Sequence, residues 1–244
     1  MKEQAESRQN SRRSLTEMAY RRIKEMMLNY DIVPGQRLIF SDLAKRLNVS
    51  RTPVNNALSI LASEGFLDFV PNQGYTVHQI TQEEAVWLYE LREIIELGAI
   101  DIAIEKVTPE KLETLKRQKQ LYEKSVIENV SRGRFILDQE FHAGYVQMAE
   151  NPHLTAYFRE VYQRIFLRHR IEGLPAGRAS EVVKEHRAIY DAICQRDGKK
   201  ARQLIKHHIK AGKEYIFSSI FAKTDEMEPI HLGRPRIPLG VGLS

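Results

Sequence analysis

The chain has 244 residues, of which 42% are apolar and 28% are charged, a composition that excludes a wholly disordered polymer and leaves room for two folded domains. Its net charge is +5, and residues 1–77 contribute +3 of this through 11 Lys and Arg against 8 Asp and Glu. The basic excess is therefore denser at the N-terminal end, as contact with nucleic-acid phosphates would require.

No segment of the sequence is suited to cross a membrane. The longest apolar stretch, residues 94–104, is interrupted by Glu96 and Asp101, and residues 1–13 contain no apolar run of a signal peptide. The single cysteine, Cys194, has no disulfide partner and lies in an apolar helical pattern, which predicts a buried thiol. We expect a cytoplasmic protein without a membrane partner.

The first helix is expected to begin after a flexible basic arm, residues 1–13. Ser14 and Glu17 have the spacing of a capping box, and the residues that follow repeat apolar side chains at helical intervals. The segment from Arg37 to Phe40 is expected to form a short strand that pairs with a later hairpin.

Two short helices are predicted next. Ser41 is placed to cap the first, which runs to Leu47, and Ser50 is placed to cap the second. In the second helix an apolar stripe of Val54, Leu58 and Leu61 leaves its polar residues on the outer side, as in a DNA recognition helix; these are Arg51, Thr52, Asn55 and Asn56.

Two alternating segments, residues 66–70 and 75–77, flank the turn residues 71–74 and predict a β-hairpin. The whole pattern is typical of a winged helix-turn-helix. Periodicity alone also allows an ordinary packing helix followed by a hairpin.

The residues themselves carry a resemblance. The segments 32–38, 50–54 and 72–77, read Ile-Val-Pro-Gly-Gln-Arg-Leu, Ser-Arg-Thr-Pro-Val and Asn-Gln-Gly-Tyr-Thr-Val, closely resemble the DNA-binding domain of GntR-family bacterial transcription regulators. The resemblance implies a DNA-binding domain over residues 14–78 and a double-stranded, pseudo-palindromic operator. The DNA contacts expected on this basis are Ser41, Ser50, Arg51, Thr52, Asn55, Asn56 and Gly74. The family usually has Arg-Glu where this chain has Asn55-Asn56, so the usual operator sequence is not assumed.

Residues 79–223 have helical periodicity, with breaks near 107–109, 131–133, 150–152, 171–179 and 196–198. These breaks predict an all-α bundle of about six helices. Thr81 and Glu84 form a second capping box at its start. Residues 224–244, rich in proline and glycine, are expected to be a flexible tail. The predicted fold is therefore mostly α, with a winged helix-turn-helix followed by a helical bundle.

Four side chains of the predicted bundle have the spacing of a metal site. Asp138 and His142 lie one helical turn apart, and His186 and His208 are each 11 residues from Asp197, in the turn of a helical hairpin, so their rings stand at one height. One Asp and three His suit a divalent ion, Zn²⁺ first, with Ni²⁺, Mn²⁺ or Fe²⁺ as alternatives. Each histidine taken alone could equally be a packing residue.

This spacing, together with Leu88–Arg92 and Ala149–Pro152, is similar to the metal-binding version of the FadR C-terminal domain (FCD), the effector domain of one GntR subgroup. The resemblance implies a homodimer and a small carboxylate effector. It favours His208 over His207 as the last ligand, because the family's histidine precedes an aliphatic residue, here Ile209. His153 and His169 fall outside the pattern.

Arg92 shares a helix face with apolar residues, which directs it toward the bundle interior, where a guanidinium needs an anion. That anion is either a structural carboxylate or the carboxylate of an effector. We expect a ligand-responsive DNA-binding regulator that represses transcription. The alternatives are a metal-dependent, hydrolase-like enzyme that uses the Asp and three His, or a bundle that serves only for dimerisation.

Overall fold

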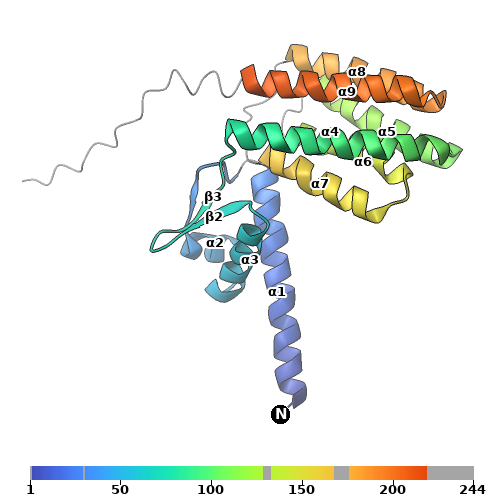
Figure 1. The fold of residues 1–244 in the computed structure, drawn as a ribbon. Helices are drawn as coiled ribbons and strands as arrows, with labels where there is room; N and C mark the ends of the chain where they lie inside the picture. Colours follow the sequence, from blue (N-terminus) through green and yellow to red (C-terminus); the bar gives the residue numbers. More distant parts are fainter. Residues whose placement is uncertain (1, 30, 129–132, 168–175, 219–244) are drawn as a thin grey trace, which may run out of the picture.

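The computed structural model describes residues 2–29, 31–128, 133–167 and 176–218. An N-terminal part contains three helices and a small sheet, and a C-terminal part contains six helices (Figure 1). Within these ranges no helix is both long and apolar enough to traverse a lipid bilayer. The expected mostly-α fold is confirmed, whereas the expected tail, 224–244, lies outside the described residues.

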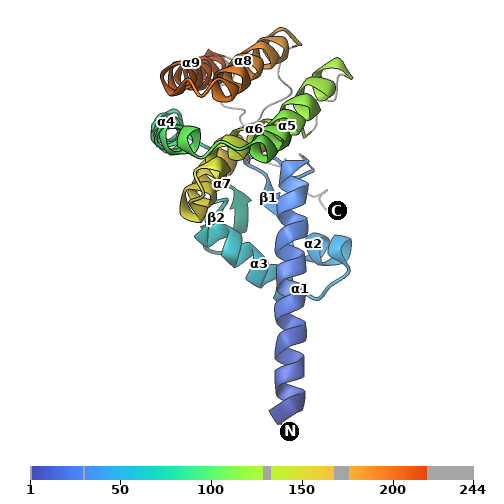
Figure 2. The same cartoon turned by 90° about the vertical axis from the view of Figure 1, so that its right-hand side faces the viewer.

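Helix α1 spans Lys2–Leu28 and extends well beyond the rest of the N-terminal part (Figure 2). The sequence placed the start of this helix at Ser14, whereas the helix begins at Lys2, so residues 2–13 are a helical extension of α1. The physical reason is composition: this segment is rich in Lys, Arg, Glu, Gln and Ala and contains no Gly or Pro, so a helix can continue through it.

Helices α2 (Phe40–Leu47) and α3 (Arg51–Ser63) form the predicted helix-turn-helix. The turn ends α2 at Asn48, whose left-handed backbone (φ 53°) is one that Asn tolerates. Ser41 does not cap α2, because Ile39 takes the extended N-cap conformation and its carbonyl accepts the amides of Asp42 and Leu43. Ser50 does occupy the N-cap of α3, but its side chain makes no capping hydrogen bond.

The sheet is antiparallel, with the order β1-β3-β2. Strands β2 (Leu67–Val70) and β3 (Gly74–Val77) form the wing hairpin, and β1 (Arg37–Leu38) pairs with β3 so that Arg37 lies opposite Thr76. The expected strand is thus confirmed for its first two residues, whereas Phe40 already belongs to α2. Gly74 opens β3 with φ +88°, a conformation that side chains other than glycine rarely adopt.

A single apolar core unites the N-terminal part. Helix α1 packs against α3, and the wing covers the end of the core with Tyr75 and Val77. Its most deeply buried side chains come from α1, α3 and the segment after α3, and include Ala19, Ile23, Val54, Leu58, Leu61 and Phe66. Helices α1, α2 and α3, packed together with the wing hairpin, form a winged helix-turn-helix.

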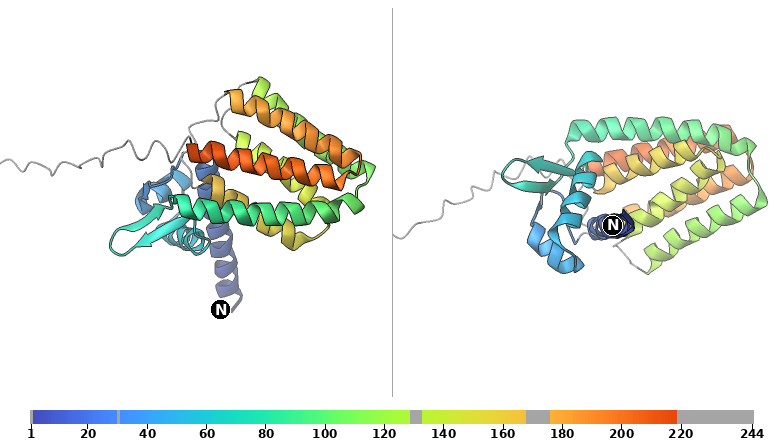
Figure 3. Two further views of the ribbon diagram at one scale, coloured as in Figure 1. Left: turned by 45° about the horizontal axis from the view of Figure 1, so that its top comes forward. Right: turned by 90° about the horizontal axis from the view of Figure 1, so that it is seen from below.

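The C-terminal part is a bundle of six described helices that run side by side (Figure 3). They are α4 (Gln82–Glu105), α5 (Pro109–Ile127), α6 (Arg134–Met148), α7 (Pro152–Leu167), α8 (Ala176–Cys194) and α9 (Gly198–Ile216). The predicted breaks at 107–109, 150–152 and 196–198 are confirmed, and Thr81 Oγ1 accepts the Glu84 amide at 3.1 Å as a capping box requires. Because α6 packs against α4, α5 and α7 while α9 packs against α4 and α8, side chains from four helices can meet in the interior.

Candidate metal centre and DNA-binding face

The interior of the bundle brings together Asp138 and His142 of α6, His186 of α8 and His208 of α9. One potential ligand atom from each lies within 4.8 Å of all the others. The three histidines are buried, whereas the neighbouring His207 is exposed on the outer face of α9. The structure thus places His208, and not His207, beside the other three side chains.

The spacing of these atoms suits a shared cation. His142 Nε2 lies 3.0 Å from His208 Nε2, and the Asp138 oxygens lie 3.2 Å from His186 Nε2 and 3.8 Å from His142 Nε2. Ligand atoms bonded at about 2.1 Å to one ion are separated by roughly 3–4 Å. Neither ring nitrogen of the fully buried His186 makes a hydrogen bond of good geometry, although Nε2 lies 3.2 Å from Asp138 Oδ1, and a cation bound to one of these nitrogens would satisfy it. The donor set therefore fits a divalent metal.

The electrostatics favour the protonation states that bind metal. Burial lowers the pKa of His186 to about 4 and also lowers the pKa of His208, so these two rings are held neutral. Burial alone would raise the pKa of Asp138, but the contact between its carboxylate and the His186 ring, with His142 and His208 close by, outweighs burial and holds that pKa well below its ordinary value. A neutral imidazole and a carboxylate are the forms that coordinate a cation.

Further side chains orient the histidines. Glu185 Oε2 lies 2.6 Å from His208 Nδ1, and Arg178 in turn donates to both oxygens of Glu185 at 2.6 and 3.0 Å. His142 Nδ1 lies 2.7 Å from Glu96 Oε2 and 2.6 Å from the Tyr145 hydroxyl. Such partners select the tautomer of a ligand histidine and make its free nitrogen a better donor to a metal.

Asp138 is held in the same way by a tyrosine. The Tyr162 hydroxyl on α7 donates to Asp138 Oδ2 at 2.5 Å, so the carboxylate is turned toward the histidines by α7 as well as by its own helix. Every described helix of the bundle thus contributes to the centre or its immediate support, α5 through Tyr122, whose ring centroid lies 4.9 Å from that of His186.

Arg92 of α4 is 2% exposed, as its apolar helix face predicted. Its Nε donates to Glu96 Oε1 at 2.5 Å, which makes Glu96 the structural carboxylate foreseen as one of the two possible partners. Nη2 lies 3.2 Å from His142 Nδ1, so the guanidinium also adjoins the candidate metal centre. Burial would raise the pKa of Glu96, but the adjoining guanidinium of Arg92, together with the contacts that His142 and Tyr145 make with the carboxylate, outweighs burial and lowers that pKa below its ordinary range.

Sequence reasoning missed Glu96, Tyr145, Tyr162 and Glu185 as parts of the site. A signal existed for Glu96, because it lies four residues after Arg92 in an otherwise apolar helix, where two opposite charges can pair. Glu185 is next to His186 but serves His208 on another helix, and no pattern in the sequence distinguishes the two tyrosines from packing residues.

The predictions for the single cysteine and for the two histidines outside the cluster can also be compared with the structure. Cys194 is exposed and not a core thiol, because it lies on the outer side of the last turn of α8, in which Ala192 and Ile193 are the residues buried in the core. His153 is exposed, and His169 lies outside the described residues.

The predicted DNA-contacting residues lie on the surface of the helix-turn-helix. In α3, Arg51, Thr52, Asn55 and Asn56 are exposed, whereas Pro53, Val54, Ala57 and Leu58 are buried beneath them. Ser41 in the first turn of α2 and Ser50 before α3 are exposed, and Gly74 at the start of β3 is half-buried. One polar face of the recognition helix is therefore free of contacts with the protein core.

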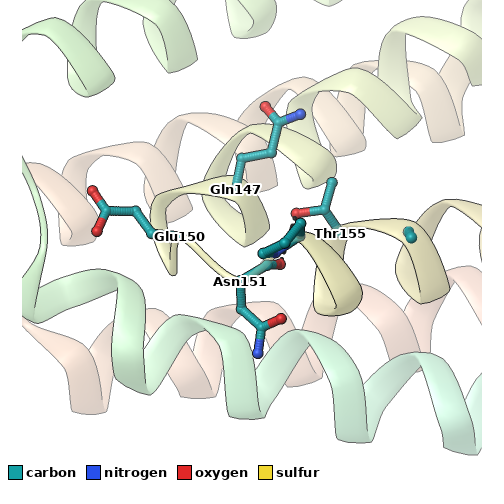
Figure 4. Close-up of a pocket in the computed structure, with 6 residues that line it drawn as sticks. Gln147, Glu150, Asn151 and Thr155 are labelled. Atoms are coloured by element: carbon teal, nitrogen blue, oxygen red, sulfur yellow. Dashed lines mark hydrogen bonds between the residues drawn. The ribbon is translucent and has the colours of Figure 1, made fainter.

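Two surface pockets lie away from the candidate metal centre. One, of about 460 Å³, is formed at the turn between α6 and α7 by Gln147, Glu150, Asn151, Pro152, Thr155 and Ala156 (Figure 4). Its polar groups have structural tasks, since Asn151 Oδ1 accepts the amides of His153 and Leu154, and Glu150 pairs with Lys111 at 2.7 Å. The other, of about 670 Å³, lies between α1 and α3 and includes Tyr20, Asn56 and Glu64.

Comparison with known families agrees with both parts of the fold. Residues 15–77 match the family described as bacterial regulatory proteins, gntR family, and residues 87–211 match the FCD domain. The chain belongs to the GntR family of bacterial regulators. The FCD match spans the four clustered side chains and Arg92, so the candidate centre of this GntR-family protein lies entirely within its FCD domain.

This chain aligns with known transcription regulators over most of their length. The Nta operon transcriptional regulator of Aminobacter aminovorans is 28% identical over 212 residues, which are 86% of this chain and 99% of that protein. The HTH-type transcriptional regulator YdhC of Bacillus subtilis is 26% identical over 198 residues, covering 81% and 88% of the two chains. The solved structure of Escherichia coli McbR/YncC, 22% identical, covers 84% of this chain and 97% of its own with a TM-score of 0.74, which shows the shared fold.

Proposed function

We propose that this GntR-family protein is a metal-dependent sensor of a small organic acid, which represses transcription as a homodimer bound to a pseudo-palindromic operator. The observation that carries the proposal is the buried cluster of Asp138, His142, His186 and His208, in which His186 makes no hydrogen bond of good geometry and has Asp138 Oδ1, 3.2 Å from its Nε2, as its one charged neighbour. A buried structural histidine without a well-formed hydrogen bond would destabilise the bundle, so a site adapted to a ligand explains it better.

The four residues would hold a divalent ion, with Zn²⁺ preferred for a site of three nitrogens and one oxygen. When bound, the ion supplies a Lewis acid for the carboxylate of the effector. Glu185 and Glu96 keep the ring nitrogens of His208 and His142 oriented, and Asp138 supplies the negative charge. Arg92 adjoins His142, and its guanidinium is the cationic group placed to attract a carboxylate into the same interior region.

The effector signal would reach DNA through α4. Arg92 lies on this helix, which begins at Gln82, only five positions after β3 ends at Val77. A shift of α4 on binding of the acid would therefore turn the winged helix and change the separation of the two recognition helices. The acid must bind the two forms of the dimer unequally, because equal affinities leave the equilibrium unchanged.

The recognition helix α3 would enter the major groove with its exposed polar face. Arg51 is suited to guanine or phosphate, and the amides of Asn55 and Asn56 are suited to adenine edges. Ser41, Ser50, Thr52 and Gly74 would contact the backbone around it. The relatives, all named as transcription regulators, support this role over that of a metal-dependent hydrolase.

The test uses thermal shifts of the full chain. Zn²⁺ added to chelator-treated protein should raise the melting temperature, and at least one small carboxylate should raise it further only when Zn²⁺ is present. An operator fragment obtained by binding-site selection should then show a change in affinity with that carboxylate. A melting temperature that Zn²⁺ leaves unchanged would reject the metal centre, and turnover of the carboxylate would favour the enzyme.

A further inference from the structure

One face of α4 exposes large apolar side chains. Trp87 is 58% exposed, Leu91 43%, Ile94 69% and Ile102 40%, whereas the opposite face of the same helix is buried in the bundle core. Figure 2 shows α4 at the edge of the bundle, with no described helix outside it. Trp87, Leu91, Ile94 and Ile102 follow one another at intervals of four, three and eight residues, which places them on one side of the helix. We call this row of exposed apolar side chains the α4 stripe.

A glycine lies within the α4 stripe, four residues after Ile94. A Cβ built on Gly98 would meet no atom within 4 Å, so no packing within the described chain requires a glycine there. Glycine in the middle of a helix is unfavourable compared with alanine. Its presence on an exposed apolar face is explained if another helix approaches the backbone closely at this point.

We infer that the α4 stripe is the dimer interface, in which α4 packs antiparallel against α4 of a second copy of this chain. The inference rests on the homodimer of the proposed function and assigns its surface. If the two-fold axis passes between Ile94 and Ile95, Leu91 of each copy lies over Gly98 of the other, and Trp87 lies over Ile102. The stripe is thus complementary to itself, with a large side chain facing the glycine.

The charges beside the stripe are complementary in the same arrangement. Glu90 is exposed on the edge of α4 that faces α9, because Glu93, three residues on, pairs with Lys206 at 3.2 Å. In an antiparallel pair of identical helices, the same edge of each helix faces its counterpart on the other. The axis between Ile94 and Ile95 therefore places Glu90 opposite position 99 of the second copy. That is where α9 presents Arg202, whose Nη1 donates to the Leu97 carbonyl at 3.0 Å and to Asp101 Oδ2 at 2.5 Å, so Glu90 would share a guanidinium that already pairs with Asp101.

The antiparallel arrangement also spaces the DNA-binding domains correctly. With this axis, the two Gln82 residues that begin α4 are ~37 Å apart along the pair at 1.5 Å per residue. Half-sites one helical turn of DNA apart are separated by roughly 34–36 Å. A parallel pair would bring the two helix starts to about 8–10 Å, the distance between packed helix axes, which is too close for successive major grooves.

Sedimentation velocity of the full chain tests the surface. The wild type should be a dimer, and Ile94→Glu and Gly98→Leu should each raise the dimer dissociation constant at least tenfold while retaining the helical circular dichroism of the monomer. Gly98→Leu is the sharper variant, because it removes an unfavourable helix residue and so weakens the dimer without weakening α4. Leu121→Glu, on the exposed face of α5, is the control and should remain dimeric.

Disulfide trapping tests the orientation in a Cys194→Ser background. Leu91→Cys combined with Gly98→Cys should form an intermolecular disulfide under mild oxidation, whereas Leu91→Cys alone should not. A disulfide with Leu91→Cys alone would show a parallel pair and overturn the proposed arrangement.

The outcomes separate this inference from the proposed function. A dimer that persists in both Ile94→Glu and Gly98→Leu would overturn the α4 interface and leave the homodimer intact. A wild type that stays monomeric, with or without operator DNA, would overturn both. A monomer in which deletion of residues 219–244 exposes Trp87 to a fluorescence quencher would assign the stripe to the chain's own C-terminal segment and likewise reject the second copy.

Discussion

His78 Nε2 lies 2.8 Å from Glu84 Oε2, and this contact joins the end of the wing to the first turn of α4. The other ring nitrogen of His78 lies 2.9 Å from Asp68 Oδ1 on β2. One imidazole therefore connects the DNA-binding domain and the FCD domain, within the short segment that the chain provides between them. This places the wing under the direct influence of the helix that carries Arg92.

The first prediction concerns this connection. His78→Ala should lower the free energy of unfolding by about 0.5–1.5 kcal/mol, the scale of one or two partly exposed charge-assisted contacts. It should also weaken operator binding several-fold. A DNA-binding domain that is loosely joined to the FCD domain loses more conformational freedom when it is fixed on DNA. Chemical denaturation and fluorescence anisotropy measure the two effects. His153→Ala, an exposed histidine, is the control, and equal behaviour of the two variants would show that the His78 contacts carry no coupling.

The second prediction revises what the sequence suggested for Arg92. If the carboxylate of an effector were its only partner, Arg92→Ala would fold normally and lose only the effector response. In the structure, Arg92 Nε donates to Glu96 Oε1 at 2.5 Å in a fully buried site. Removal of the guanidinium therefore leaves a buried carboxylate without its cationic partner. Arg92→Ala should therefore cost about 3–5 kcal/mol of folding free energy, and Glu96→Gln added to it should recover part of that loss. If the free energy of unfolding of Arg92→Ala in urea equals that of the wild type, Arg92 has no structural role and acts only in effector binding.

Metal retention is the third prediction. Alanine at Asp138, His142, His186 or His208 should each weaken Zn²⁺ binding at least 100-fold, since every variant removes one of four ligands. His207→Ala, one residue from a ligand but exposed, should retain a full equivalent. Elemental analysis after dialysis against a weak chelator gives the stoichiometry. Loss of metal from His207→Ala with retention in His208→Ala would show that the wrong histidine had been assigned.

Arg51 is the subject of the fourth prediction. It is exposed at the first position of α3, so its removal should leave the fold unchanged. Arg51→Ala should weaken operator binding by about 1–3 kcal/mol, the usual worth of a specific Arg contact with guanine. Gel-shift titration with specific and random DNA separates the possibilities: a uniform loss on both would identify a phosphate contact instead.

The last prediction concerns operator sequence. Asn55 is exposed beside Asn56 where the family usually has Arg-Glu. Asn55→Arg should shift the preferred base at one position of each half-site toward guanine, because Arg reads guanine and Asn reads adenine. Binding-site selection with both proteins would reveal the change. Identical selected sequences would mean that Asn55 faces the DNA backbone or solvent.

The sequence by itself determined the architecture and the candidate ligands. Helix periods, turn residues and capping pairs are local signals, so they located the winged helix, the six bundle helices and most of their breaks. Local counting placed His186 and His208 at one height, since a helical hairpin puts residues at equal distances from its turn at one height, whereas the choice of His208 over His207 rested on the resemblance to the FCD family. The errors at this level were local competitions: Ile39 displaced Ser41 as the cap of α2, and the helix-forming residues 2–13 extended α1 past Ser14.

Only the tertiary structure decided how the side chains are paired. His142 and Glu96 are 46 positions apart, and Glu185 serves His208 and not the adjacent His186. Such contacts depend on how each helix is rotated and tilted against its neighbours and on which rotamer fits the space between them, and neither is encoded within a few residues of sequence. The partner of Arg92 differs, because Glu96 lies four residues away on the same helix and the sequence could have named it; only the contacts of Arg92 and Glu96 with His142 depended on the packing of α4 against α6.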